Sequence, residues 1–229
     1  MVESMLLQIS QYLFFILLPI LAIYLGYLII TKAFNDMGFS TGEAVIIVFV
    51  CFILGYGIID SYVGIPFQNI YLFTYNNWNV GINTGGAIIP LIVSIYLTIK
   101  NKLDKKRLGI CILLVALTTY LVTTPDPEKG IISMFPYWCI PIVIASILSS
   151  IFYRKERRRA PVVAYVSGTL GVLIGADIFH LYSLLNSGTS TVRTAVIGGA
   201  SVFDMIFITG ISAVIIDGIL IRQEKHKKQ

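Results

Sequence analysis

Apolar residues dominate long stretches of the chain, and short polar segments separate them. Seven stretches have the length and polarity of membrane-spanning helices, at residues 8–31, 44–64, 80–99, 108–124, 131–153, 160–185 and 194–221. A helix rises about 1.5 Å per residue, so roughly 20 apolar residues cross the hydrocarbon core of a bilayer. The pattern therefore predicts an all-α fold, a polytopic membrane protein with seven transmembrane helices.

Composition agrees with this pattern. Hydrophobic residues make up 56% of the 229 residues, charged residues make up only 13%, and the mean hydropathy is +0.84. A soluble domain carries charged residues at about 25%. We therefore expect residues 1–229 to form a single transmembrane domain, a multi-pass protein of the cell membrane whose first partner is lipid.

The basic residues predict the orientation of these helices. They cluster at 100–107, 154–159 and 222–228, three segments that lie on the same side of a chain with seven crossings. Lys and Arg are enriched in cytoplasmic loops, so the N-terminus is expected outside and the C-terminus inside. Only Lys129 and Arg193 of the 17 basic residues then lie outside. The net charge of +5 is explained in this way and indicates no nucleic-acid partner.

The chain carries no recognisable cofactor motif, and we expect no cofactor. Cys51, Cys111 and Cys139 lie in separate apolar segments without a CxxC pair, which indicates neither a disulfide framework nor a zinc site. No nucleotide-binding motif appears, and the expected span 194–221 has no lysine for a retinal Schiff base.

Three short motifs recur in the same order. They are "LPILAI" (18–23) with "IPIVIA" (140–145), "ILGYGIIDSY" (53–62) with "LIGADIFHLY" (173–182), and "TGGAII" (84–89) with "IGGASV" (197–202). Each pair would cross the membrane in one direction, which indicates a 3+1+3 parallel repeat with units 8–99 and 131–221 joined by helix 108–124. Some transporters have halves related in this way by an axis along the membrane normal. Chance similarity between segments rich in Ile, Leu, Gly and Ala is the alternative.

Polar residues deep in the apolar segments are the candidate site. A charged side chain at the bilayer centre costs about 2.5–3.5 kcal/mol on insertion scales, so such residues face a bundle interior or a wet cavity. His180 follows Asp177 by three residues, so the two are expected on one helix face, where His180 could relay a proton. We expect an ion- or substrate-binding site in the outer half of the membrane, formed by Asp60, Asn83, Asp177, His180 and Asp204. A metal is an open possibility for this set, and an interhelical hydrogen-bonded clasp is the structural alternative.

Two further features predict contacts between helices. Gly171 and Gly175 form a GxxxG face, which would let the spans 160–185 and 194–221 pack closely. Asp217 lies about one turn inside the cytoplasmic end of the last span, where we expect it to pair with a nearby Lys or Arg.

Two resemblances follow from these motifs. The segments "SGTLGVLIGAD" (167–177), "IGGASVFDMIFITGI" (197–211) and "GGAIIP" (85–90) resemble the prokaryotic membrane-protein family known as domain of unknown function 1614. That resemblance covers about residues 80–215 and implies a polytopic fold centred on Asp177 and Asp204, without an activity. Phe203-Asp204 and Gly175-Ala176-Asp177 are more loosely similar to the motifs of intramembrane aspartyl proteases, although the motif order is reversed, Ala176 replaces a glycine and no Pro-Ala-Leu segment is present.

These observations leave three functional hypotheses. The first is a transporter-like protein in which intramembrane carboxylates bind a proton, a cation or a small cationic substrate. The second is a hydrolase or protease in which Asp177 and Asp204 are the catalytic pair, share a proton and activate water. The third is a membrane scaffold without catalysis.

Overall fold

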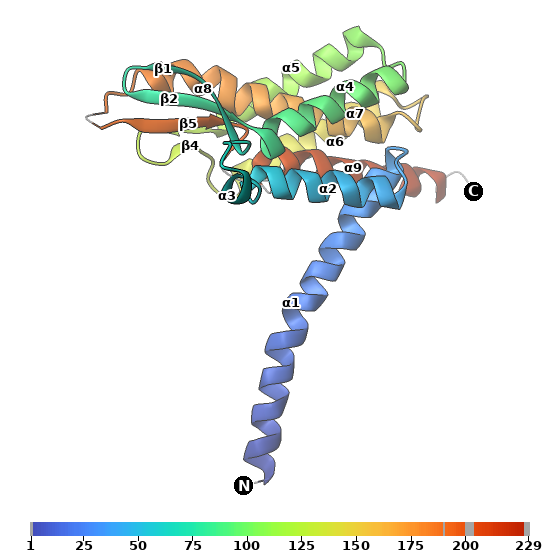
Figure 1. Cartoon of the computed structure of the whole chain (residues 1–229). Helices are drawn as coiled ribbons and strands as arrows, with labels where there is room; N and C mark the ends of the chain where they lie inside the picture. Colours follow the sequence, from blue (N-terminus) through green and yellow to red (C-terminus); the bar gives the residue numbers. More distant parts are fainter. Residues whose placement is uncertain (1, 190, 200–203, 227–229) are drawn as a thin grey trace.

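The fold is a bundle of helices with two small β-sheets at one end (Figure 1). We describe it from a computed structural model that covers residues 2–189, 191–199 and 204–226. The long helices are α1 (Val2–Asp36), α2 (Thr41–Gly55), α4 (Ile89–Lys100), α5 (Lys105–Val122), α6 (Ile140–Phe152), α7 (Ala160–Val172) and α9 (Met205–His226). Shorter helices are α3 (Asp60–Val63), α8 (Phe179–Leu185) and the 3-10 turn η2 (Tyr137–Cys139).

Two helical segments are π-helical, with wider turns than an α-helix. They are η1 (Thr84–Ile88), which precedes α4, and η3 (Leu173–Ile178), which joins α7 to α8. Such wide turns are rare and frequently occur at functional sites. Both lie at the end of the bundle that meets the sheets (Figure 1).

The central helix is α7, which packs against α4, α5, α6 and α9. Almost every residue of α7 is buried. Gly171 and Gly175 do not face α9, as the sequence predicted, but α5: a Cβ on Gly175 would lie 2.2 Å from the carbonyl oxygen of Ala116. The helices α7 and α9 do pack closely, but through Gly168 and Gly210. The expected contact therefore exists with a different set of glycines.

The larger sheet has the strand order β1-β2-β5, formed by β1 (Asn69–Tyr75), β2 (Trp78–Asn83) and β5 (Arg193–Ile197). Strands β1 and β2 form an antiparallel hairpin whose turn residues Asn76 and Asn77 have positive φ angles of 45° and 65°. Asparagine tolerates this conformation better than most residues do, which favours a tight hairpin turn here. Strand β5 joins β2 in parallel, and the smaller sheet is a hairpin of β3 (Thr124–Asp126) and β4 (Gly130–Ile132).

The strands correct three of the predicted helix boundaries. Residues 80–83, 131–132 and 194–197, expected as the starts of spanning helices, are strands. Each is a short Val- and Ile-rich segment, which fits a strand as well as a helix, and pairing with a distant segment decides between the two. The fold is therefore mostly helical but not all-α. Residues 200–203 of the last predicted span lie outside the described residues.

Within the described residues, two helical segments are long and apolar enough to cross a membrane: Tyr12–Asp36 and Ala160–Leu185. Four shorter apolar helices accompany them, at Thr41–Gly55, Thr84–Lys100, Tyr137–Phe152 and Met205–Leu220. The N-terminal part of α1 extends away from the bundle, and only its last turns pack against α2 and α9 (Figure 1). The count of seven spans stays a prediction.

The internal repeat also stays a prediction. One observation supports it and one counts against it. The parallel pairing of β2 with β5 aligns Ile82 with Ile197. The chain therefore enters η1 and α4, which follow β2, from the same end of the bundle as α9, which follows β5. The matched glycine pairs differ, because Gly85 and Gly86 lie in a π-helix whereas Gly198 and Gly199 have positive φ angles.

Candidate carboxylate site

Asp177 and Asp204 line one cavity between the helices. This cavity has a volume of about 360 Å³, and we call it the bundle cavity. It is lined among others by Thr123, Trp138, Val172, Asp177, Asp204 and Ile208. The two carboxyl groups are close enough to interact electrostatically. The tertiary structure thus brings together two acidic residues that are 27 positions apart in the chain.

The π-helical segment η3 positions Asp177. One carboxylate oxygen, Oδ2, accepts a hydrogen bond of 2.6 Å from the backbone N–H of Gly198. Gly198 has a φ of +90°, a conformation that L side chains rarely adopt. A Cβ on this glycine would lie 2.4 Å from that of Ala87, so a glycine is needed for the turn that delivers this N–H to Asp177.

Asp204 caps the start of α9. Its Oδ1 accepts hydrogen bonds from the backbone N–H groups of Ile206 and Phe207 at 2.9 and 3.2 Å. Aspartate is a favoured N-cap residue because its side chain satisfies backbone donors that have no partner within the helix. The second oxygen, Oδ2, lies beside Gly199, where a Cβ would come within 2.3 Å of it. Each acidic residue therefore uses one oxygen for a backbone contact.

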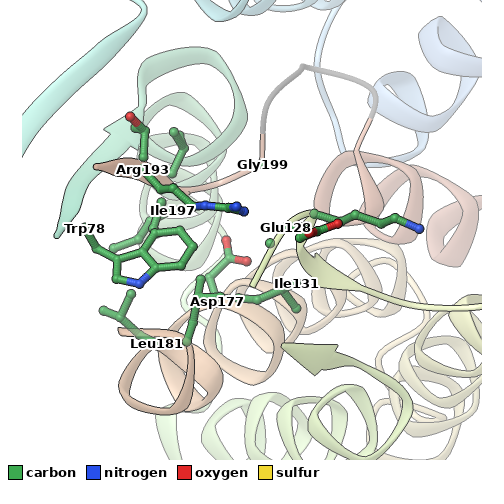
Figure 2. A pocket seen from close by; sticks show the side chains of 14 residues that line it. Trp78, Glu128, Ile131, Asp177, Leu181, Arg193, Ile197 and Gly199 are labelled. Carbon is green, nitrogen blue, oxygen red and sulfur yellow. The ribbon is translucent and has the colours of Figure 1, made fainter. Parts of the chain in front are cut away.

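A second cavity adjoins the first at Asp177. It has a volume of about 440 Å³ and lies against the sheet, so we call it the sheet cavity. Figure 2 shows its labelled lining residues Trp78, Glu128, Ile131, Asp177, Leu181, Arg193, Ile197 and Gly199. Asp177, Ile131 and Gly199 line both cavities. Asp177 is the carboxylate at their boundary.

Apart from Asp177, the charged residues of the sheet cavity were not in the predicted site. Glu128 and Lys129 come from the β3–β4 turn, and Arg193 begins β5. The sequence did carry a signal for two of them, because Lys129 and Arg193 are the basic residues that the orientation rule leaves outside. Asp126 orders the same turn: its Oδ1 accepts hydrogen bonds from the N–H groups of Glu128 and Lys129. These bonds hold the pKa of the Asp126 carboxyl below its ordinary value.

Two of the predicted site residues have structural partners instead. Asp60 accepts backbone hydrogen bonds from Phe67 and Gln68 at 2.9 and 3.0 Å, which fixes the loop before β1. Asn83 is fully buried, and its side chain joins the end of α2, β1 and η1 through bonds to Gly55, Asn69 and Gly86. Neither residue is among those that line the two cavities in the described part of the chain.

His180 lies near Asp177 in sequence but faces a different element. Its Nε2 is 3.1 Å from the carbonyl oxygen of Tyr120 on α5, and its ring stacks on the Tyr120 ring at 4.4 Å. The π-helical turn explains the difference, because the wider turn rotates residues three apart off the common face expected for an α-helix. His180 lines neither cavity among the described residues.

Asp217 is a buried carboxylate, for which the sequence predicted pairing with a nearby Lys or Arg. The structure gives it two hydroxyl donors from α6, Ser149 and Ser150, at 2.9 and 2.7 Å. Its side chain is fully buried. The basic side chains that follow Asp217 in α9, Arg222 and Lys225, lie outside the described side chains, so the pairing with a Lys or Arg stays a prediction.

The site offers few ligands for a metal. Within the ranges that the structure describes, no group of three or more His, Cys, Asp or Glu side chains could hold an ion. The paired carboxyl groups instead suit a proton, a cation or a positively charged group, which a small number of oxygens can bind.

The comparisons with known proteins identify a family without an activity. The family model described as "Protein of unknown function (DUF1614)" matches residues 59–216, a region that includes both cavities. No curated protein matches the chain, and no solved structure matches it.

Proposed function

This chain belongs to the DUF1614 family, and we propose that it is a multi-pass membrane protein with a transporter-like function. In this proposal Asp177 and Asp204 bind a proton, a cation or a small cationic substrate inside the bundle. The observation that carries the proposal is that both carboxyl groups line the bundle cavity while Asp177 also lines the sheet cavity. A group bound at Asp177 is therefore accessible from two cavities.

The distribution of polar and apolar side chains supports a location in lipid. Large apolar residues are exposed along the outward faces of the helices, including Ile46 and Phe49 on α2, Ile92 and Ile99 on α4, and Leu113 and Leu121 on α5. Buried positions of the bundle hold polar residues, including Ser94, Thr119, Ser146, Ser149 and Thr209. Large exposed apolar patches are rare on soluble monomers and mark contact with a membrane or a partner.

The positions of the loops support the predicted orientation. The basic α4–α5 and α6–α7 connections lie together at one end of the bundle, and the sheets lie at the other (Figure 1). Because basic loops are retained on the cytoplasmic side, the sheets and both cavities belong on the outer side. The C-terminus is then inside, and a separate crossing by α1 puts the N-terminus outside.

The pair of carboxyl groups explains why a positively charged species would bind. Two carboxylates in one cavity repel each other, and a shared proton or a bound cation relieves that repulsion. Carboxylates within membrane helices commonly line ion and proton pathways for this reason. Asp177 then exchanges the bound species between Asp204 on one side and the sheet cavity on the other.

Flux measurements on reconstituted protein test this function. Purified protein in lipid vesicles containing a pH-sensitive dye, with a potassium-driven membrane potential, should carry protons faster than empty vesicles. Asp177→Asn and Asp204→Asn should each lower the rate to that of empty vesicles, since asparagine removes the exchangeable charge. Both variants should fold, because asparagine still accepts the Gly198 N–H bond at position 177 and is also a good N-cap at position 204.

The control is Asp36→Asn, which removes a carboxylate that pairs with Lys32 at the end of α1, outside both cavities. Its flux should equal that of the unmodified protein. Unmodified protein that carries no protons, no metal cations such as sodium and no small organic cations contradicts the proposal. Cleavage of a membrane-embedded peptide by such a protein, lost in both Asp variants, would favour the hydrolase instead.

A further inference from the structure

We infer that the sheet cavity binds a small zwitterionic solute, with its carboxylate on Arg193 and its ammonium group toward Asp177 and Glu128. This inference rests on the proposed function in that it names the class of solute that would reach Asp177 from the outer side. It shares Asp177 with the proposed transport site but concerns binding in the sheet cavity, so it can be tested without transport.

The charges that line the sheet cavity are balanced. They come from two acidic side chains, Glu128 and Asp177, and two basic ones, Lys129 and Arg193. A cavity for a simple anion or a simple cation would carry an excess of one sign. Balanced charges of both signs favour a solute that itself carries both.

Arg193 and Asp177 do not neutralise each other. Among the described residues no ion pair involves Arg193, and the carboxylate of Asp126 acts on it only at longer range. The two side chains enter the cavity from different walls, Arg193 from β5 and Asp177 from η3 (Figure 2). The space between the two charged groups is part of the cavity.

Each of these two charged side chains has a backbone partner of its own. The guanidinium of Arg193 donates a hydrogen bond to the carbonyl oxygen of Pro127, and Asp177 accepts one from the N–H of Gly198. The β3–β4 turn therefore holds Arg193, and the residue that follows β5 holds Asp177. A guanidinium has five N–H donors in a planar fork, so Arg193 retains donors for a carboxylate after binding Pro127.

The remaining walls suit a short carbon chain. Trp78, Leu181, Leu184 and Ile197 form the apolar part of the lining. A volume of about 440 Å³ falls within the range of roughly 300–1,000 Å³ that is typical of small-molecule sites. A linear amino acid has the combination that these walls offer: two opposite charges with methylene groups between them.

The chain provides its own optical probe for this cavity. Of its two tryptophans, Trp78 lines the sheet cavity and Trp138 lines the bundle cavity. Trp138→Phe therefore leaves a single fluorophore in the sheet cavity, and Trp78→Phe leaves one in the bundle cavity as the matched control. Fluorescence would be titrated on the full chain in detergent or lipid, with linear amino acids from glycine to 6-aminohexanoate.

The expected result is a saturable change of Trp78 fluorescence with an optimum chain length. The best amino acid should bind at least about tenfold more tightly than the carboxylic acid and the amine of the same length, because each lacks one charge-assisted hydrogen bond. Equal affinities for the three compounds would overturn the inference, and so would the absence of binding by every amino acid of the series.

Two substitutions divide the roles of the charges. Arg193→Gln should remove the preference for the amino acid over the amine, and Asp177→Asn should remove its preference over the carboxylic acid. A general loss of structure would weaken all three compounds alike and would count against the assignment. Binding without flux of protons or cations would refute the proposed transport but leave this inference intact, while such flux without binding would do the reverse.

Discussion

At the scale of single residues, the polar side chains deep in the sequence have different roles. Asp177 and Asp204 line a common cavity, whereas Asp60, Asn83 and Asp217 form hydrogen bonds that connect secondary-structure elements. Burial of a polar group costs free energy, and hydrogen bonds offset this cost: backbone groups bind Asp60 and Asn83, and serine hydroxyls bind one oxygen of Asp217.

Asp60 tests this division. Replacement by asparagine leaves one oxygen to accept a hydrogen bond in place of two, so either Phe67 or Gln68 loses its partner. We expect Asp60→Asn to destabilise the protein by about 1.5–3 kcal/mol, the usual contribution of a hydrogen bond to a charged group. Thermal unfolding in lipid or detergent measures this change. Proton flux should stay normal, and lost flux at unchanged stability would return Asp60 to the binding site.

At the scale of elements, close contact between α7 and α5 depends on small residues. A Cβ on Gly175 would meet the carbonyl oxygen of Ala116 and the side chain of Thr119, so Gly175→Ala should force the two helices apart. The expected destabilisation is about 1–3 kcal/mol, the usual cost of overpacking. Gly109→Ala is the matched control on α5, since nothing lies within 4 Å of its added Cβ. It should be neutral or slightly stabilising, as alanine favours a helix by about 1 kcal/mol over glycine.

Thermal unfolding of both alanine variants checks this contrast. Equal stability of the two variants would mean that α5 and α7 do not approach as closely as the structure shows.

The β3–β4 turn should respond to acid. The N–H groups of Glu128 and then Lys129, with the charges of Lys129 and Arg193, hold the Asp126 pKa below its ordinary value. A lowered folded-state pKa means that Asp126 stabilises the turn above its unfolded pKa of about 3.9 and loses this effect as the pH falls through the folded value. Hydrogen exchange of residues 128–132, corrected for its intrinsic pH dependence, should therefore accelerate in acid.

Asp126→Asn is the control for this prediction. Its turn should exchange at a rate that no longer depends on pH in this range after the same correction. Persistence of the full acid response in the variant would assign it to another group.

At the scale of the whole molecule, the proposal that the bundle spans a membrane predicts its topology. In a background without Cys51, Cys111 and Cys139, single cysteines would replace Thr74 on β1 and Lys155 in the α6–α7 connection, which are both exposed. An impermeant thiol reagent added to intact cells should label position 74 and spare position 155. Labelling at both positions after lysis serves as the control. The opposite pattern in intact cells would invert the topology and place both cavities on the cytoplasmic side.

The sequence predicted the residues of the cavities only where an acidic residue lies within an apolar segment. Asp177 and Asp204 stood out because a carboxylate in apolar sequence is costly wherever it lies. Glu128 and Arg193 lie in polar segments, where a charged side chain costs little free energy. The orientation rule singled out Arg193 as a basic residue on the outer side, but nothing in the sequence placed either residue in a cavity. His180 was misplaced because a π-helical turn cannot be inferred from the spacing of residues alone.

The sequence by itself determined the mostly helical class, the family and the positions of the two acidic residues of the cavity. Hydropathy and the free-energy cost of a buried charge are local properties, so they can be read from a window of some 20 residues. Only the tertiary structure decided that the ends of three predicted spans form strands. That outcome depends on hydrogen bonds between distant segments, such as the pairing of β2 with β5, whose aligned residues Gly81 and Val196 are far apart in the chain. The backbone N–H and C=O groups at the ends of these predicted spans need hydrogen-bond partners, and the fold as a whole decides which segment supplies them.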